Sequence, residues 1–131
     1  MRSIVNILSA ISDDKALLLF KTIAQSENYN TGMLITKLRV NRKQFYFIMK
    51  KLMNVHLVRR INGKYRLTSL GKIVFRAQAR VEIAVENHWK LKALDSVIMS
   101  VRKTGLSPQE RQMFIDKLIE NYEIKNILLS K

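Results

Sequence analysis

The sequence predicts a mainly α-helical protein with one small β-hairpin, which is an α+β fold. Three observations lead to this expectation. Apolar residues recur at spacings of three and four through most of the 131 residues. Only one Pro and four Gly are present to interrupt helices. The pair Asn62-Gly63 separates two short extended runs, as in a tight hairpin turn. The length is typical of one domain, and 47% apolar residues can form a modest core.

Residues 1–11 form an apolar N-terminal segment. Its apolar positions are too dense for an exposed helix, and the segment is too short to be stable alone. We expect it to pack on the core or on a partner subunit. Ser12 is then expected to cap the first core helix, with acidic residues in its first turn, and this helix ends near Ser26.

Two helices joined by a tight turn follow. Thr31 is expected to cap a short helix that runs through Leu38, and residues 39–41 form the turn. Asn41 and Gln44 match a capping box, which predicts that the second helix begins here. The apolar positions of this helix share one face and should point into the core: Phe45, Ile48, Met49 and Leu52.

The hairpin is expected to pair residues 57–61 with residues 64–67 around Asn62-Gly63. Thr68 or Ser69 then caps a single long helix that runs to about Val101. A helix of about 30 residues spans roughly 45 Å, so its far end should need a partner. Its apolar positions alternate at four and three in a heptad pattern: Leu70, Val74, Ala77, Val81, Ala84, His88 and Leu91.

Ser107-Pro108 with Glu110 is the clearest helix start in the chain. The apolar stripe of this helix is Met113, Phe114, Leu118, Ile119 and Tyr122, and apolar residues continue to the C-terminus. We interpret residues 12–72 as the core of the protein. The N-terminal segment together with residues 73–131 is interpreted as a dimerisation layer, with these interface residues: Leu8, Val81, Ala84, His88, Leu91, Phe114 and Leu118.

The charge is strongly unbalanced. The formal net charge is +14, from 24 Lys and Arg against 10 Asp and Glu. Between Glu27 and Glu82 there is no acidic residue, whereas thirteen Lys and Arg lie in this interval. A concentrated field of one sign favours a polyanionic partner, and nucleic acid and an anionic membrane surface are the ordinary candidates. The membrane is the weaker candidate, because the apolar residues beside these cations are needed for the core.

The order of these elements resembles the winged helix-turn-helix domain of MarR- and ArsR-type transcriptional regulators. Residues 40–43 stand where that family has the turn and the start of its recognition helix, and residues 57–60 lead into its wing. The ending Tyr65-x-Leu67-Thr68-x-x-Gly71 is also similar. The resemblance covers roughly residues 12–95. One departure is His56, where the family often has Gly; a left-handed conformation there costs about 1 kcal/mol.

The resemblance implies a homodimer that binds double-stranded DNA. Cations and aromatics on the outer face of one helix fit base and phosphate contacts, although aromatic burial in an interdomain contact would also explain Tyr46 and Phe47. The recognition-helix candidates are Arg42, Lys43, Gln44, Tyr46, Phe47, Lys50 and Lys51. The wing candidates are Arg59, Arg60, Asn62, Gly63, Lys64 and Arg66, which could instead be charges that protect an edge strand from aggregation.

The sequence contains no pattern typical of an enzyme. No phosphate-binding loop, nucleophile motif or metal-ligand spacing is present, and the chain has no cysteine and only two histidines. His56 and His88 are better explained by structure than by metal binding. We expect no catalytic site, cofactor or metal. No signal peptide or membrane-spanning run is evident, so a cytoplasmic location is expected.

The leading hypothesis is a sequence-selective, homodimeric transcriptional regulator. The alternative is a winged-helix interaction or architectural module that binds protein or nucleic acid without sequence preference. Retention of a preferred site against random competitor DNA separates the two hypotheses. No pattern in the sequence specifies a small-molecule effector, an operator or the direction of regulation.

Overall fold

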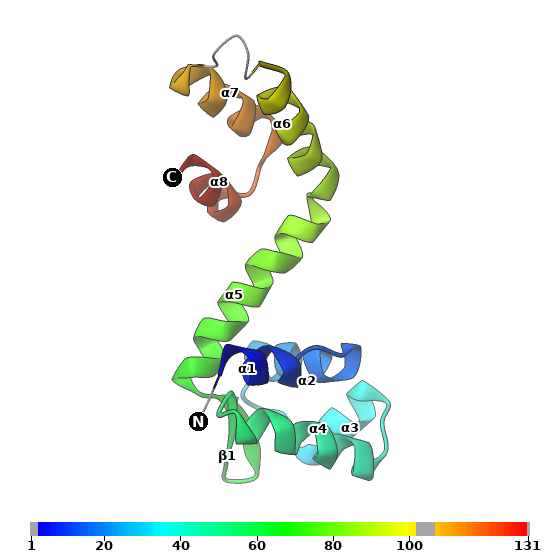
Figure 1. The fold of residues 1–131 in the computed structure, drawn as a ribbon. Helices are drawn as coiled ribbons and strands as arrows, with labels where there is room; N and C mark the ends of the chain where they lie inside the picture. Colours follow the sequence, from blue (N-terminus) through cyan, green and yellow to red (C-terminus); the bar gives the residue numbers. More distant parts are fainter. Residues whose placement is uncertain (1–2, 102–106, 131) are drawn as a thin grey trace. The chain divides into compact units, whose positions relative to one another are not determined.

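The computed structural model describes residues 3–101 and 107–130, and this part of the chain is mainly helical with one two-stranded antiparallel hairpin (Figure 1). The contacts divide the chain into two compact units, where length alone favoured a single domain. Unit 1 comprises Met1–Arg76 and unit 2 comprises Ala77–Lys131. Residues 3–11 of the predicted N-terminal segment therefore belong to the same unit as the predicted core.

Unit 1 contains four helices, the hairpin and the start of a fifth helix, in this order: α1 (Ile4–Ala10), α2 (Asp14–Gln25), α3 (Thr31–Leu38), α4 (Arg42–Asn54), β1 (Val58–Ile61), β2 (Lys64–Leu67) and α5 (Ser69–Glu86). Fifteen buried apolar residues form its core, drawn from the four helices and from both strands. Phe20, Phe45 and Tyr65 are its largest fully buried side chains. The Tyr65 hydroxyl lies 3.1 Å from Thr31 Oγ1, so this buried phenol has a hydrogen-bond partner.

The starts of α2 and α3 each differ by one residue from the prediction. Asp13, rather than Ser12, caps α2, and its carboxylate accepts a hydrogen bond of 2.8 Å from the Ala16 amide. Asn30, rather than Thr31, caps α3 by accepting from the Met33 amide at 2.9 Å. Adjacent residues at both sites have side chains that can cap a helix. Only the backbone conformation decides which of them stands outside the first turn.

The turn between α3 and α4 and the capping box of α4 are confirmed. Arg39 ends α3 in the left-handed conformation, with φ 55°. The Asn41 side chain accepts from the Gln44 amide at 2.8 Å, and the Gln44 side chain accepts from the Asn41 amide at 3.1 Å. These two bonds satisfy donors that a helix start leaves open, which fixes where α4 begins.

The hairpin has the predicted turn. Val58 pairs with Leu67 and Ile61 with Lys64, and Asn62 and Gly63 have positive φ angles of 52° and 76°. Leu57, expected in the first strand, precedes it and is fully buried. Just before it, His56 has φ 60°, which is the left-handed conformation considered for this position.

Thr68 and Gly71 join the hairpin to α5. The Thr68 hydroxyl accepts from the Gly71 amide at 2.9 Å, so Thr68 caps the helix, and it also donates to the His56 carbonyl. A Cβ atom at Gly71 would lie 2.1 Å from the Leu57 carbonyl oxygen. Only glycine allows this close approach of α5 to the chain that enters the hairpin.

The single long helix predicted for residues 69–101 is wrong, because it is divided at Asn87 into α5 and α6 (His88–Val101). The Asn87 side-chain amide donates to the Ile83 carbonyl at 2.8 Å, and the Asn87 backbone amide donates to the same oxygen at 3.0 Å. Asn87 then accepts from the Leu91 amide with its own carbonyl at 3.0 Å. A side chain that bonds to the carbonyl four residues earlier gives that oxygen a second donor, and bonds of this kind often bend helices.

The rest of unit 2 consists of α7 (Pro108–Leu118) and α8 (Tyr122–Leu129). The predicted start of α7 is confirmed, because Ser107 Oγ accepts from the Glu110 amide at 3.1 Å. The core of the unit is formed by Leu94, Ile115, Ile119 and Ile124. Met113, predicted in the apolar stripe of α7, is 57% exposed, and Ile115 is the buried residue of this helix. Tyr122, predicted in the same stripe, instead begins α8 and is 75% exposed.

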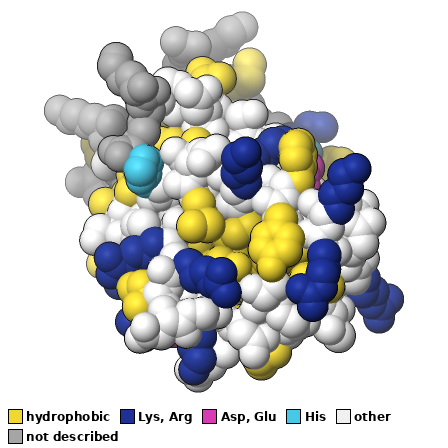
Figure 2. All heavy atoms as spheres, turned by 90° about the horizontal axis from the view of Figure 1, so that it is seen from below, with side chains coloured by type: hydrophobic (Ala, Val, Ile, Leu, Met, Phe, Trp, Pro, Cys, Tyr) yellow, Lys and Arg dark blue, Asp and Glu magenta, His cyan; other side chains and the backbone are white. Residues whose placement is uncertain are grey.

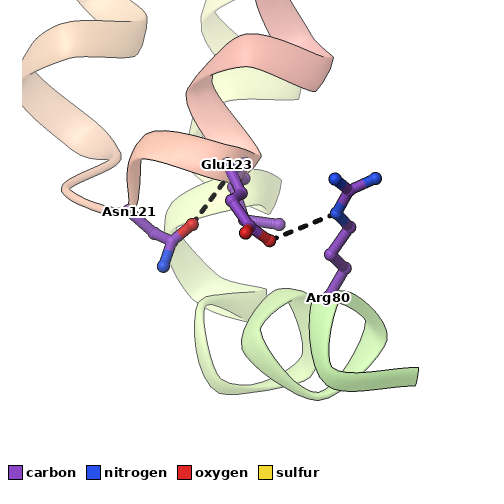
Figure 3. A network of polar contacts seen from close by, with 4 residues as sticks. Arg80, Asn121 and Glu123 are labelled. Atoms are coloured by element: carbon purple, nitrogen blue, oxygen red, sulfur yellow. Dashed lines mark hydrogen bonds and ion pairs between the residues drawn. The ribbon is translucent and has the colours of Figure 1, made fainter. Parts of the chain in front are cut away.

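An ion pair joins α5 to α8 within unit 2. Arg80 Nε lies 3.2 Å from Glu123 Oε2, and both side chains are about half exposed, at 51% and 49% (Figure 3). Asn121, beside it, caps α8 by accepting from the Ile124 amide at 3.0 Å (Figure 3). An exposed pair of this kind contributes little stability, so the buried apolar side chains are the main source of cohesion.

Candidate nucleic-acid interface

Helix α4 has two distinct faces. Phe45, Ile48, Met49 and Leu52 are buried in the core of unit 1. Since these positions repeat at helical spacing, the residues between them must point outward. The outward face carries the six charged or aromatic side chains predicted to contact DNA, and all six are exposed: Arg42, Lys43, Tyr46, Phe47, Lys50 and Lys51.

The two aromatic side chains of this face are held by neighbours. Tyr46 is 48% exposed, and its ring meets the buried Phe45 ring edge-on at 5.3 Å between centroids. Phe47 is 62% exposed, and Lys51 Nζ lies 4.4 Å from the centre of its ring. Neither ring is needed to fill the core of unit 1. Both rings are therefore available to contact a ligand, and the neighbouring side chains restrict their orientation.

Gln44 differs from the other predicted recognition residues. Its side-chain oxygen is occupied by the Asn41 amide within the capping box. A glutamine that reads adenine uses both its oxygen and its nitrogen, in a bidentate contact. The geometry thus gives Gln44 a structural role at the start of α4, and only its amide nitrogen remains to donate outward.

The hairpin exposes the predicted wing residues. Arg59, Arg60, Lys64 and Arg66 are all on the surface, and Asn62-Gly63 forms the exposed tip. Two of these cations have neighbours in the chain. The Arg60 guanidinium lies 5.7 Å from the centre of the Tyr65 ring, and Arg66 Nη2 lies 3.8 Å from Glu27 Oε2. Arg59 and Lys64 have no side-chain ion pair among those the structure gives for the described residues.

The positive charge is concentrated in unit 1. This unit contains fifteen Lys and Arg and three acidic residues, a net charge of +12, whereas unit 2 has nine against seven, a net charge of +2. Figure 2 shows hydrophobic side chains with Lys and Arg side chains on several sides of them, on the face formed by α3, α4 and the hairpin. An apolar patch bordered by cations suits a ligand with an anionic backbone and apolar edges.

Sequence reasoning missed two cations beside α4. Lys15 and Arg39 line a hollow of about 240 Å³ with Gln44 and Phe47, and Asp13 is its one acidic lining residue. The Lys15 ammonium donates to the Leu38 carbonyl at 2.9 Å, which holds it against the end of α3. Lys15 lies 27 positions before Arg42 in the sequence, so only the tertiary fold brings it to this site.

The predicted dimer residues fall into two groups. Ala84, Leu91, Phe114 and Leu118 pack partly against the core of unit 2. Leu8 on α1 and Val81 on α5 are 53% and 63% exposed. His88 is also exposed, and its ring lies 5.3 Å from the Trp89 ring. The first group contributes to the fold of its own unit, and the second group remains on the surface.

Comparison of the chain with family models, with curated proteins and with solved structures finds no match to any of them. The site is therefore interpreted from its own geometry and charge. In residues 3–101 and 107–130, no group of three His, Cys, Asp or Glu could hold a metal ion. No helix in the same ranges is both long enough and apolar enough to cross a bilayer.

Proposed function

We propose that the chain is a sequence-selective DNA-binding transcriptional regulator that acts as a homodimer. In this proposal unit 1 is a winged helix-turn-helix domain of the MarR or ArsR type, α4 is its recognition helix and the β1–β2 hairpin is its wing. The observation that carries the proposal is the outward face of α4, where two exposed aromatic rings lie among four exposed cations. This helix follows a tight turn and precedes a basic hairpin.

The dimensions of α4 suit the major groove of B-DNA. A helix with its side chains is about 10–12 Å across, and the groove is about 12 Å wide. Residues near the start of a recognition helix reach the base edges. Arg42 and Lys43 can donate to the O6 and N7 atoms of guanine. Tyr46 and Phe47 offer apolar surface to the methyl group of thymine, and Lys50 and Lys51 neutralise phosphates.

The hairpin supplies the second contact. Its exposed tip, Asn62-Gly63, is narrow, and Arg59, Arg60 and Lys64 surround it with positive charge. Such a tip can lie along the DNA backbone or enter the minor groove beside the helix. Lys15 and Arg39, which share a hollow with Phe47, add phosphate contacts on another side of α4. These contacts fix the position of the protein on DNA and do not themselves read sequence.

The homodimer predicts the form of the binding site. Two subunits related by a two-fold axis would bind a near-palindrome with half-site centres about 10 base pairs apart, or a multiple of that spacing. If each subunit neutralises about five phosphates, the dimer neutralises about ten. The logarithm of affinity should then fall with the logarithm of salt concentration at a slope near −9.

The alternative function is an interaction or architectural module without sequence preference. It is favoured by one observation: the cations of unit 1 are not confined to α4 and the hairpin but extend over residues 37–76. A uniform basic surface binds any duplex through its phosphates. The aromatic pair on α4 favours the sequence-selective function over this alternative, because phosphate binding does not need Tyr46 and Phe47.

Competition between duplexes tests the proposal. The full chain is bound to a labelled duplex that contains its preferred site, and random duplex is added as competitor at fixed salt. A selective regulator should prefer its site by roughly a thousandfold or more. Equal competition by random DNA would support the architectural alternative. A salt slope shallower than about −2 would contradict DNA binding as the main function.

A further inference from the structure

A stripe of exposed apolar residues runs along α5 and α6 in unit 2. It consists of Ala77, Val81, Val85, Trp89 and Ala93, which occur at every fourth position and are all exposed. Val81, Val85 and Trp89 are 63%, 69% and 74% exposed. Residues four apart form a ridge on a helix surface, and such ridges interlock when two helices pack. We call these five residues the α5–α6 stripe.

The stripe is not part of the core of its own unit. Only four apolar residues of unit 2 are fully buried among those that the structure describes: Leu94, Ile115, Ile119 and Ile124. Ala84 and Leu91, in the heptad pattern of the sequence, pack toward this core, whereas the stripe faces away from it. A tryptophan and two valines gathered on one exposed ridge are typical of an interaction surface.

The charges along the same stretch indicate which partner covers the stripe. Between Val81 and Ala93, the acidic residues Glu82 and Glu86 precede Asn87. The basic residues Lys90 and Lys92 follow it. This segment is therefore complementary to a second copy of itself in the antiparallel direction. Unit 2, which carries the stripe, has a net charge of only +2, so two copies of this unit repel each other weakly. Two copies of unit 1, at +12 each, repel each other strongly.

We propose that the α5–α6 stripe is a self-association surface, covered by the stripe of a second copy that runs antiparallel about a two-fold axis near Asn87. This pairing places Val81 opposite Ala93 and Val85 opposite Trp89 of the second copy, so that large side chains meet smaller ones. It also brings the acidic half of each segment to the basic half of the other. The inference rests on the proposed homodimer and specifies which surface forms it.

Cysteine cross-linking tests the pairing, because the chain has no cysteine of its own. The double variant Val81→Cys with Ala93→Cys should form a covalent dimer on mild oxidation at micromolar concentration. Each single variant should form little, because in the antiparallel pairing positions 81 and 81 are far apart. A bond within one chain is excluded, since the sites lie twelve residues apart across α5 and α6, about 18 Å at the rise of a helix, and a disulfide needs Cα atoms within about 7 Å.

The control is Met113→Cys, which places a cysteine at an exposed apolar position outside the stripe. It measures cross-linking by random collision. Cross-linking of the double variant at the level of this control would overturn the proposal. Efficient cross-linking of Val81→Cys alone would overturn the proposed pairing, because that result requires either parallel helices or a two-fold axis at Val81 instead of Asn87.

Trp89 provides a second readout, as it is the one tryptophan of the chain. Its side chain is 74% exposed in the single copy, so dilute protein should emit at the long wavelength of a hydrated indole. Emission should move to shorter wavelength as the concentration rises and dimers form. Unchanged emission in a sample shown to be dimeric by sedimentation would contradict the proposed surface.

DNA binding is measured separately, so the two proposals can fail independently. Trp89→Glu should give a monomer that still binds a single half-site and loses the preference for paired half-sites. If this variant remains dimeric, the stripe is not the interface, whatever the DNA result. If the cross-links form as expected and no duplex is bound, the surface stands and the proposed function is wrong.

Discussion

Lys51 Nζ lies 4.4 Å from the centre of the Phe47 ring, one helical turn away on the exposed face of α4. At an exposed site this cation–π contact contributes about 0.5–1 kcal/mol, enough to favour one orientation of a ring that packing does not fix. The contact joins an apolar group suited to base edges with a cation suited to phosphate. In the proposed function, the contact of Phe47 with a base is therefore coupled to the contact of Lys51 with the DNA phosphate backbone.

Removing the aromatic side chains should reduce discrimination between DNA sites more than total affinity. Phe47→Ala or Tyr46→Ala should each lower the ratio of specific to random binding by about tenfold, since a base-edge contact is worth roughly 1–3 kcal/mol. Lys50→Ala should instead weaken all duplexes alike and reduce the salt slope by about 1. Titrations of one specific and one random duplex measure both effects. Equal behaviour of the two kinds of variant would remove the assignment of Tyr46 and Phe47 as base readers.

The chemical group that Phe47 contacts can be tested on the DNA. Replacing thymine by uracil, one position at a time, removes only the C5 methyl group from the major groove. At the contacted position, the protein should lose several-fold in affinity, whereas Phe47→Ala should bind both duplexes equally. Competition assays with the two duplexes give the four affinities of this cycle. A loss of the same size in both proteins would show that another residue contacts the methyl group.

Gly71 should be intolerant of any side chain. In Gly71→Ala the new Cβ would meet the Leu57 carbonyl oxygen at 2.1 Å, a backbone atom that cannot move without displacing the hairpin. We expect a loss of about 3 kcal/mol or more in the free energy of unfolding, measured by denaturant titration. Gly32→Ala is the matched control. There the nearest atom is 3.6 Å away, and alanine in a helix should stabilise by up to about 1 kcal/mol.

The capping box should stabilise the start of α4. Asn41→Ala removes the acceptor of the Gln44 amide and should lower the free energy of unfolding by about 1 kcal/mol. Asn41→Asp keeps the acceptor and should retain stability, while its negative charge beside Arg42 should weaken DNA binding. Denaturant titration and duplex titration of both variants separate these effects. A stability loss in the aspartate variant equal to that in the alanine variant would contradict the capping role.

Local signals in the sequence were enough to predict several features of unit 1. The Asn41–Gln44 capping box, the Asn62-Gly63 turn and the core face of α4 each depend on residues within a few positions of one another. The exposure of Tyr46 and Phe47 followed from the same helical spacing. The caps of α2 and α3 were wrong by one residue, because neighbouring side chains can both accept the capping bond.

Features that depend on tertiary packing were not predictable in this way. The division at Asn87 was not predictable either, because an asparagine at helical spacing does not by itself indicate a break; its side chain bonds back to the Ile83 carbonyl. Ile115 and Met113 are both apolar residues of α7, and only packing against α6 and α8 decides that Ile115 is the buried one. Lys15 joins the hollow beside Phe47 because α2 packs against α4, which no local pattern of residues indicates.

Selection of bound sequences from a random pool of duplexes tests the proposed function most directly. The full chain is incubated with the pool, bound duplexes are recovered over several rounds, and the most enriched sequence is titrated against salt. The proposal predicts an enriched inverted repeat with half-sites about 10 base pairs apart, or a multiple of that spacing, and a salt slope near −9. Binding without enrichment of any sequence would contradict selective regulation and leave the architectural alternative.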